Sequence, residues 1–464
     1  MTKNAFSSLA LKPGLVDNLA SMGYAEMTPI QAQSLPSILK GQDVIAQSKT
    51  GSGKTAAFGL GLLENIDPKN FSAQALVLCP TRELADQVAN EIRKLGRAIA
   101  NVKVLTLCGG SPFRVQADSL QHGAHILVGT PGRIEDHLRK ATVNLDQIKI
   151  LVLDEADRML EMGFQKSVDA IVEQMPTKRQ TLLFSATYPA EIQAIAERIM
   201  IDPVMASVEA KHDSGTIQQH FYSVDNDEER QTAIRLLLLK YRPESTVVFC
   251  NTKREAQAIA DDLRGHGFSA LALHGDLEQR DRDQTLVRFS NKSISVLVAT
   301  DVAARGLDID ELDAVINYHI ARDPEMHVHR IGRTGRAGKK GTAYSLISEK
   351  ESYKVALLKD YLGQFIETEP LPPIHLLKQI PSKPSMATLL IDGGKKQKVR
   401  PGDILGALTG DNGIAGAQVG KINIFHNRAY VAVHHSAAKP ALKKLSEGKL
   451  KGRVFRTRLL RGHP

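Results

Sequence analysis

The chain of 464 residues is long enough for about three domains, and its 42% of apolar residues can bury a core in each. This composition excludes a disordered or fibrous protein. The longest unbroken aliphatic run, residues 236–239, is too short to span a bilayer, so we expect a cytoplasmic protein. Cys79, Cys108 and Cys250 lie in separate apolar runs without zinc or redox spacing, which indicates reduced core thiols.

Charge is distributed unevenly along the chain. The net charge is +9, yet residues 371–464 contain 17 Lys and Arg against four Asp and Glu, so the preceding part is mildly acidic. A basic tail of this kind favours contact with a polyanion, with a merely basic soluble surface as the alternative.

Short apolar runs alternate with amphipathic stretches in the first part of the chain. Because the runs are apolar throughout, they predict parallel strands that helices cover on both faces. The runs lie at residues 43–47, 74–79, 102–107, 125–129, 148–153 and 181–184 and, after a polar stretch at 209–219, at 246–250, 269–273, 294–299 and 314–318. The pattern predicts an α/β fold with two doubly wound sheets in tandem, in domains at residues 1–207 and 208–368.

A change of pattern marks a third domain. Five of the twenty prolines fall within residues 370–384, which predicts an extended linker at 369–385. The expected order beyond it is strand 388–391, helix 401–408, strands 418–425 and 428–433, helix 437–445 and strand 454–459. This β-α-β-β-α-β order is that of RNA-recognition motifs and predicts a small α+β RNA-binding domain at 386–464.

A glycine-rich loop at residues 48–55 follows one predicted strand and opens a helix. Its glycines let backbone N–H groups converge on phosphate oxygens, and the helix N-terminus adds partial positive charge. We expect Lys54 to reach the β and γ phosphates and Thr55 to ligate Mg²⁺. The first glycine usual in such loops is Ser48 here. A glycine-rich turn without nucleotide is the alternative, which the strand and helix context disfavours.

A second motif, at residues 150–157, is an aliphatic strand that ends in carboxylates. Open parallel sheets bind ligands at this edge. Asp154 is therefore placed to hold Mg²⁺, partly through water, and Glu155 to orient or deprotonate the attacking water. A solvated acidic strand end is the alternative.

Seven short segments occur in one order at compatible spacings, namely residues 28–31 (TPIQ), 48–55 (SKTGSGKT), 80–85 (PTRELA), 130–133 (TPGR), 154–157 (DEAD), 185–187 (SAT) and 329–336 (HRIGRTGR). From residue 4 to about residue 365, the chain resembles the DEAD-box ATP-dependent RNA helicases. The resemblance implies two RecA-like domains, ATP and Mg²⁺ as cofactors, and RNA as the partner.

The resemblance also assigns roles at the nucleotide. Gln31 matches the adenine reader, and Phe6 and Tyr24 are candidates for contact with the purine, with a core position as the alternative for both. The resemblance implies that Gly306 and Asp308 contact the ribose. It implies that the phosphates are bound by the loop residues Ser48, Lys49, Thr50, Gly51, Ser52, Gly53, Lys54 and Thr55. Ser185 and Thr187 link the ATP state to strand separation through Asp157.

Arg333 and Arg336 match the arginine fingers of the family. The resemblance thus implies five catalytic residues, namely Lys54, Asp154, Glu155, Arg333 and Arg336. Arg330 is either structural or catalytic. His327 stands where the family often has tyrosine, so the support of the neighbouring arginines is left open.

One RNA strand should lie in a groove whose contacts come from both domains. The matching positions are Arg82, Gly110, Thr130 and Arg133 in the first domain and Asn251, Arg282 and Thr300 in the second. Contacts to the sugar-phosphate backbone carry no sequence information, whereas 2′-hydroxyl contacts favour RNA over DNA. Because ATP and RNA each bind both domains, each should tighten the other, which predicts local, non-processive unwinding.

We expect the basic C-terminal domain to select the RNA on which the protein acts. Residues 429–433 resemble part of an RNA-recognition strand, but Arg428 and Leu390 occupy positions where that fold usually has aromatic rings. We expect RNA contacts from Lys398, Arg400, Arg428 and Tyr430, with further basic side chains at Lys395, Lys396, Arg453, Arg456, Arg458 and Arg461. A non-specific phosphate anchor is the alternative.

A helicase core followed by such a module is similar to a bacterial branch of the family that recognises a hairpin of large-subunit ribosomal RNA. This resemblance implies 23S ribosomal RNA or precursor ribosomal particles as partners, a role in large-subunit assembly, and no stable protein partner. The alternatives are an RNA-stimulated ATPase that clamps RNA without separating strands and a DNA translocase.

Overall fold

The structure is a computed structural model that describes residues 5–48, 51–208, 217–304, 312–335, 341–363 and 365–460. The chain divides into two compact units, the first over Met1–His212 and the second over nearly all of the residues that follow. The second unit contains a parallel sheet and the C-terminal module together.

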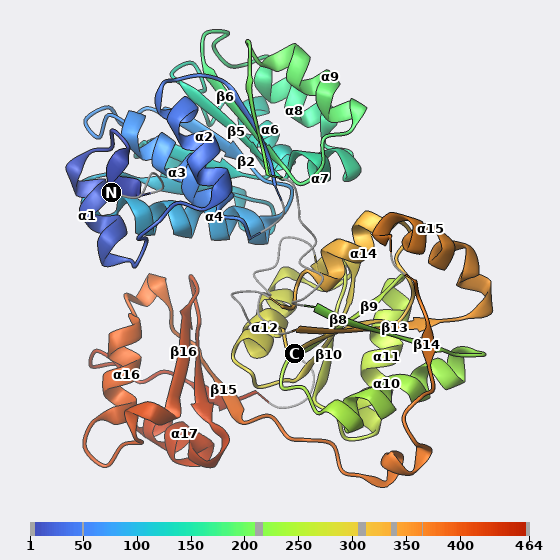
Figure 1. The fold of residues 1–464 in the computed structure, drawn as a ribbon. Helices are drawn as coiled ribbons and strands as arrows, with labels where there is room; N and C mark the ends of the chain where they lie inside the picture. Colours follow the sequence, from blue (N-terminus) through green and yellow to red (C-terminus); the bar gives the residue numbers. More distant parts are fainter. Residues whose placement is uncertain are drawn as a thin grey trace. The chain divides into compact units, whose positions relative to one another are not determined.

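The first unit is built on a seven-stranded parallel sheet with the order β3-β4-β2-β5-β6-β1-β7 (Figure 1). Its strands are β1 Val44–Gln47, β2 Ala75–Leu78, β3 Val104–Leu107, β4 Ile126–Gly129, β5 Ile150–Asp154, β6 Gln180–Ser185 and β7 Val204–Ser207. Its helices are α1 Pro13–Ser21, α2 Pro29–Leu39, α3 Lys54–Asn65, α4 Arg82–Leu95, α5 Phe113–Gln121, α6 Pro131–Arg139, α7 Ala156–Glu161, α8 Gln165–Val172 and α9 Ala190–Ile199. The six predicted strands are present, whereas the edge strand β7 was not predicted.

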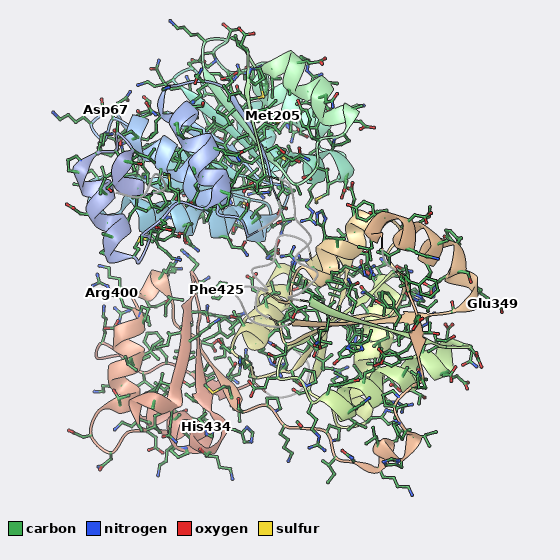
Figure 2. All side chains as sticks on the ribbon, viewed as in Figure 1. Asp67, Met205, Glu349, Arg400, Phe425 and His434 are labelled. Carbon is green, nitrogen blue, oxygen red and sulfur yellow. The ribbon has the colours of Figure 1, made fainter. Side chains whose placement is uncertain are left out.

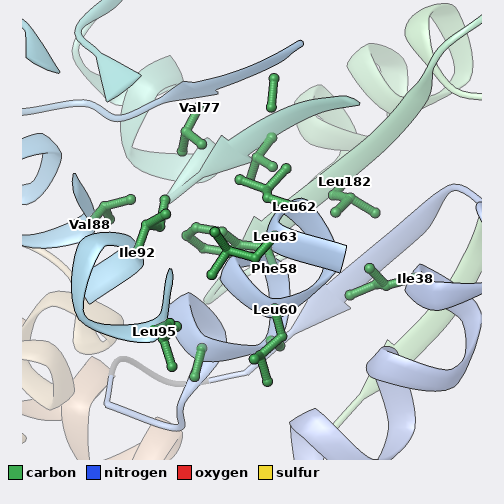
Figure 3. Packing of buried hydrophobic residues seen from close by; sticks show 14 of the residues in the cluster. Ile38, Phe58, Leu60, Leu62, Leu63, Val77, Val88, Ile92, Leu95 and Leu182 are labelled. Carbon is green, nitrogen blue, oxygen red and sulfur yellow. The ribbon is translucent and has the colours of Figure 1, made fainter. Parts of the chain in front are cut away.

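Helix α3, which follows the phosphate-binding loop, is buried along almost its whole length. It packs against α2 and α4, and Phe58 meets Phe184 of β6 edge to face with ring centroids 5.1 Å apart. Figure 3 shows Phe58 among Ile38, Leu63 and Ile92. This packing fixes the start of α3, and with it the end of the loop, relative to the sheet.

The second unit begins with another seven-stranded parallel sheet, in the order β10-β11-β9-β12-β13-β8-β14. Its strands are β8 Ile217–Ser223, β9 Thr246–Cys250, β10 Ala270–Leu273, β11 Val296–Thr300, β12 Ala314–Asn317, β13 Gly341–Ile347 and β14 Thr368–Glu369. Its helices are α10 Asp227–Tyr241, α11 Lys253–Gly265, α12 Gln279–Ser290, α13 Asp301–Ala304, α14 Pro324–Ile331 and α15 Ser352–Leu362. The four predicted strands are present, whereas β8, β13 and β14 were not predicted.

The proline-rich segment is attached to this second sheet rather than free. It follows directly on β14, which pairs with β8. Leu371 and Leu376 pack against the core of the sheet, and Arg242 Nη2 donates to Gln379 Oε1 at 2.8 Å. The linker at residues 369–385 stays a prediction, although a turn of 3-10 helix at Ile374–Lys378 interrupts the extended backbone expected there.

The C-terminal module has an antiparallel sheet in the order β16-β17-β15-β18. Its strands are β15 Met386–Ile391, β16 Val419–Ile424, β17 Ala429–His434 and β18 Thr457–Leu459, and its helices are α16 Pro401–Thr409 and α17 Ala438–Glu447. The predicted β-α-β-β-α-β order is confirmed, so the fold class of two parallel-sheet domains followed by a small α+β domain holds.

Candidate nucleotide and RNA sites

The phosphate-binding loop joins β1 to α3. Gly53 caps α3 with a φ of 92°, and a Cβ there would lie 2.4 Å from Nε2 of Gln31, so only glycine fits. The buried Lys54 donates from Nζ to the carbonyl oxygen of Ser48 at 2.7 Å. The ammonium group therefore lies against the start of the loop, where a lysine contacts phosphates in such loops. Lys49 and Thr50 lie outside the described residues.

Gln31 lies against the phosphate-binding loop. Its Oε1 accepts from the N–H of Thr28 at 2.9 Å, and its Nε2 donates to the carbonyl oxygen of Gly53 at 3.0 Å. Thr28 Oγ1 donates to Ser52 O at 2.7 Å, so the start of α2 is joined to the loop twice. A side-chain amide has two donors and two acceptor positions, which leaves one of each for a purine. Adenine contact by Gln31 stays a prediction, and support of the loop is an additional role.

The two aromatic candidates for the purine lie side by side. Phe6 is part of the buried core, and its ring meets that of Tyr24 edge to face with centroids 6.1 Å apart. The half-buried Tyr24 donates from its hydroxyl to Glu91 Oε1 at 3.0 Å, and burial together with that carboxylate raises the pKa of Tyr24 to about 12. Core packing accounts for Phe6, whereas purine contact by Tyr24 stays a prediction.

Asp154 ends β5 and is buried. Burial raises the pKa of its carboxyl to about 7, although the nearby Lys54 charge opposes the shift. A buried carboxylate of this kind gains from a cation, and the Asp154 carboxylate with the Thr55 hydroxyl supplies the hard oxygen donors that Mg²⁺ prefers. The described residues contain no cluster of three or more His, Cys, Asp or Glu that could hold a metal. A Mg²⁺ site at Asp154 and Thr55 stays a prediction.

Asp157 connects the acidic motif to the end of β6. Its Oδ2 accepts from the backbone N–H groups of Ala186 and Thr187 at 3.0 and 2.9 Å and from Thr187 Oγ1 at 3.1 Å. Its own N–H donates to Ser185 Oγ at 3.3 Å. Burial alone would raise the pKa of Asp157, but these hydrogen bonds and the Lys54 charge outweigh it and lower the pKa. The contacts expected between Asp157 and the serine and threonine are therefore present.

Arg330 is 1% exposed and joins α14 to the sheet. Its Nε and Nη2 donate to the two carboxylate oxygens of Asp301 at 2.6 and 2.8 Å, and Nη1 donates to the carbonyl oxygen of His319 at 2.7 Å. These contacts indicate the structural alternative for Arg330. Arg333 follows α14 directly and is buried. The predicted sites Gly306, Asp308 and Arg336 lie outside the described residues.

His327 lies buried on α14, one helical turn before Arg330. Its Nε2 hydrogen-bonds with Gln219 Oε1 at 3.1 Å, and its ring stacks on Phe221 with centroids 6.3 Å apart. Burial, with a smaller effect of the Arg330 charge, lowers the pKa of His327 to about 3. A neutral imidazole thus stands where the family often has tyrosine.

We expect acidification from pH 7 to 5 to destabilise the protein through His327. The unfolded histidine binds a proton near pH 6.5 and the folded one only near pH 3, so the stabilisation is complete above pH 6.5 and is lost as the pH falls. The loss between pH 7 and 5 should be about 2 kcal/mol. Urea unfolding of the wild type and of His327→Gln at both pH values measures it. The same pH dependence in both proteins would contradict the prediction.

The four RNA positions expected in the first unit lie together beyond three neighbouring strands. Arg82 begins α4 after β2, and its guanidinium lies where a Cβ on Gly109 would be 2.9 Å away. Gly110 follows β3 with a φ of 79°. Thr130 follows β4, and Arg133 Nη1 donates to Ser111 O at 3.0 Å. Since β3, β4 and β2 are adjacent, one edge of the sheet presents all four residues.

The second unit groups its RNA positions in the same way. Asn251 follows β9 and Thr300 ends β11, and these strands pair with Thr300 opposite Cys250. Arg282, on α12, donates from Nη2 to the carbonyl oxygen of Ala303 at 2.8 Å, just beyond β11. The structure therefore brings the three side chains to one edge, while RNA contact itself stays a prediction.

Helix α12 covers the sheet face on which RNA-recognition motifs usually stack bases. Leu390 of β15 and Tyr430 of β17 form one cluster with Val287 of α12. Thr388 of β15 accepts a hydrogen bond from Asn291 Nδ2 at 3.2 Å, just beyond α12. The module is therefore bound to the second parallel-sheet domain through its sheet.

This arrangement corrects the expectation for Tyr430. The side chain is 2% exposed because Val287 and Leu390 pack against it, so a base cannot stack on the ring while the module lies on α12. It also explains Leu390 at a usually aromatic position, since an aliphatic side chain there packs against the helix.

Basic side chains gather instead at one end of the module. Backbone bonds of 2.9 Å from Lys395 N to Phe425 O and from Lys396 N to His426 O hold one segment on the turn between β16 and β17. Asp392 N donates to Arg456 O at 3.0 Å, so the segment before β18 lies at the same end of the module. We call the exposed residues collected there the basic rim, namely Lys395, Lys396, Lys398, Arg400, Arg453 and Arg456. Figure 2 shows Arg400 and Phe425 at this end and His434 at the other.

Three family models match the chain, and each corresponds to one of these parts. The DEAD/DEAH box helicase model matches residues 28–195, and the helicase conserved C-terminal domain model matches residues 228–338. The DbpA RNA binding domain model matches residues 388–459, over the module.

Similarity to relatives over most of their length shows the family to which the chain belongs. The chain is 54% identical over 458 residues to the ATP-dependent RNA helicase DbpA of Escherichia coli strain K12, across 98% of this chain and 100% of that protein. The chain belongs to the DEAD-box ATP-dependent RNA helicases. This helicase is also 46% identical to the DEAD-box ATP-dependent RNA helicase CshA of Geobacillus kaustophilus, across 75% of this chain and 74% of the relative.

A solved structure of S. cerevisiae Dbp5 bound to RNA and ADP BeF3 matches this DEAD-box helicase with a TM-score of 0.72 and 32% identity. The match covers 80% of this chain and 96% of that one. The predictions of a helicase, of ATP hydrolysis and of RNA binding are thus confirmed. Within the described part of the helicase, no helix combines the length and the apolar character needed to cross a membrane.

Sequence reasoning missed two residues that hold predicted site residues of the helicase. The buried Gln116 accepts from Arg133 Nη1 at 3.0 Å and donates to the carbonyl oxygen of Cys108 at 2.8 Å. Arg158 contacts Glu155 and follows it by three residues, a spacing that could have been noticed. No comparable signal marks Gln116, which lies 17 residues before its partner.

Proposed function

We propose that this DEAD-box helicase separates short stretches of RNA duplex, and that its module directs it to large-subunit ribosomal RNA during ribosome assembly. Similarity over the whole length to DbpA of E. coli, module included, supports the target. The observation that carries the proposal is the basic rim on a module whose sheet face is covered.

The nucleotide chemistry follows from the strand ends of the first unit. Lys54 binds the phosphates, and Asp154 and Thr55 hold Mg²⁺, which neutralises charge on the phosphate oxygens when bound. Glu155 orients the attacking water and accepts its proton. Arg333 and Arg336 stabilise the charge that develops on the transferred phosphoryl group.

The link to RNA runs through Asp157. The backbone N–H of Asp157 contacts Ser185, and its carboxylate contacts Thr187 at the end of β6. Glu155, which we propose activates the water, lies two positions before it in the same motif. A change at the phosphates that moves the acidic motif therefore also moves the segment after β6. We propose that this movement alters the affinity of the first unit for RNA.

Target choice depends on phosphate positions rather than on stacked bases. With Tyr430 buried, the exposed basic rim is a surface of the module that can attract a polyanion. Its residues come from two segments that are more than 50 positions apart, so the spacing of the charges is set by the fold. A folded hairpin presents phosphates in a fixed arrangement, which such a rim can select by shape.

We expect the triple variant Lys395→Gln, Lys396→Gln, Lys398→Gln to lose preference for large-subunit ribosomal RNA over unrelated RNA. Loss of three phosphate contacts should reduce the slope of log affinity against log salt by about 2 to 3. The measurement is binding and RNA-stimulated ATPase with ribosomal RNA, unrelated RNA and DNA.

The matched control removes three exposed lysines elsewhere in the module, namely Lys439, Lys443 and Lys449. This control variant has the same charge as the rim variant. Equal loss of preference in both would show a non-specific anchor instead of a rim. Equal stimulation of the wild type by DNA would remove the RNA assignment.

A second function, an ATP-gated clamp that holds RNA without separating strands, uses the same residues. Release of a labelled strand from a duplex beside the target hairpin distinguishes the two. Strand release that requires ATP supports the helicase, whereas ATP-dependent retention of RNA without release supports the clamp.

A further inference from the structure

The acidic motif contains a buried ion pair that the chemistry above does not use. Arg158 Nη1 donates to Glu155 Oε2 at 2.9 Å, and the two side chains are 10% and 9% exposed. Glu155 is the N-cap of α7, and Arg158 lies three positions later in the first turn of the helix.

The backbone of Glu155 is held independently of this pair. The residue has a φ of 51°, in the left-handed region that is unfavourable for a residue with a Cβ. Its N–H donates to Asp154 Oδ1 at 3.1 Å, and Asp157 anchors the following turn on the end of β6. The Cα of Glu155 is thus fixed, whereas its carboxylate still has three side-chain torsions.

Arg158 restricts those torsions. Among the described residues, its guanidinium is the hydrogen-bond partner of the Glu155 carboxylate. The guanidinium is planar and holds its donors in a fixed geometry, so the contact defines the direction of the carboxylate as well as its distance. In the part of the chain that the structure describes, the bond from Arg158 goes to Oε2, and Oε1 can accept a hydrogen bond from water.

We propose that Arg158 is a positioning residue that holds the Glu155 carboxylate in the orientation in which its free oxygen meets the attacking water. The inference rests on the proposed role of Glu155 as the group that activates water. Loss of orientation at a reacting centre costs up to about 100-fold in rate without requiring a loss of substrate binding.

The experiment compares Arg158→Gln, Arg158→Lys and Arg264→Gln in the full-length chain. Arg264 pairs with Asp261 at the same spacing on the more exposed surface of α11, so it controls for removal of a helix ion pair. RNA-stimulated ATPase gives kcat and KM for ATP, a fluorescent ADP gives nucleotide affinity, and thermal unfolding gives stability.

For Arg158→Gln we expect kcat to fall about 10- to 100-fold, with KM and ADP affinity within about twofold of the wild type. Arg158→Lys should recover part of the rate, because an ammonium group can still reach the carboxylate. Arg264→Gln should match the wild type. A normal kcat in Arg158→Gln, or a fall matched by equal losses of ADP affinity and stability that Arg158→Lys does not recover, would overturn the inference.

Glu155→Gln separates this inference from the proposed function. If Glu155→Gln is inactive and Arg158→Gln turns over normally, the positioning role is wrong and the role of Glu155 stands. If Glu155→Gln itself turns over normally, the proposed chemistry fails, and the positioning role fails with it.

Discussion

Replacement of Glu155 by glutamine should reduce RNA-stimulated ATP turnover by at least about 100-fold, the scale of general-base catalysis, while ATP still binds. The amide has nearly the same shape, so the contact with Arg158 and the αL backbone can persist. What is lost is the ability to accept a proton from water. Because Lys54 and the loop are unchanged, the affinity for nucleotide should stay within a few fold.

Single-turnover ATPase and titration with a fluorescent ADP measure the two parts of this expectation. Glu161→Gln is the matched control, since Glu161 lies on the same helix α7 and its side chain is exposed. Turnover near the wild-type rate in Glu155→Gln would show that another group activates the water.

Loss of the buried carboxylate of Glu351 should have the largest effect on stability. Arg230 Nη2 donates to Glu351 Oε2 at 2.8 Å, with the side chains 2% and 8% exposed. The other carboxylate oxygen accepts from the N–H of Ile320 at 3.2 Å. Glu351→Gln leaves the Arg230 charge buried without a counter-charge, which costs about 3 to 5 kcal/mol.

Urea unfolding of Glu351→Gln against Glu349→Gln, an exposed neighbour, measures this cost. Burial alone would raise the pKa of Glu351, but His319 and Arg230 outweigh it and lower the pKa to about 2. Stabilisation by the ionised group is therefore complete above about pH 4.5 and lost as the pH falls toward 2. A difference below about 1 kcal/mol between the two variants at pH 7 would contradict the prediction.

The strands that sequence reasoning found are those with uniform apolar runs. In the first sheet β5, Ile150–Asp154, is buried at every position, and its first four residues are all aliphatic. By contrast β7 is an edge strand, and Met205 within it is exposed. In the second sheet β8 reads IQQHFYS, and Gln218 and Ser223 within it are exposed. Apolar runs do not reveal such strands because they are not buried at every position.

The parts of the candidate site that could be predicted are the residues that directly follow the parallel strands. Parallel strands deliver their following residues to one edge, which agrees with the contact of Asp157 with Ser185 and Thr187 that the resemblance implied. The contact of Gln116 with Arg133 and the burial of Tyr430 could not be predicted, because each depends on packing between elements distant in sequence. The module shows this most clearly, since nothing in β17 indicates that α12 covers it.

The joint between α12 and the module limits how the module can be exchanged. The pairings of Leu390 with Val287 and of Thr388 with Asn291 belong to two domains at once, so neither surface can vary alone. A chimera that receives only residues 386–464 would place Leu390 and Tyr430 of the graft against a helix that lacks the side chains they pack on here. Transfer of specificity to another helicase would therefore require the matching side chains of α12 as well.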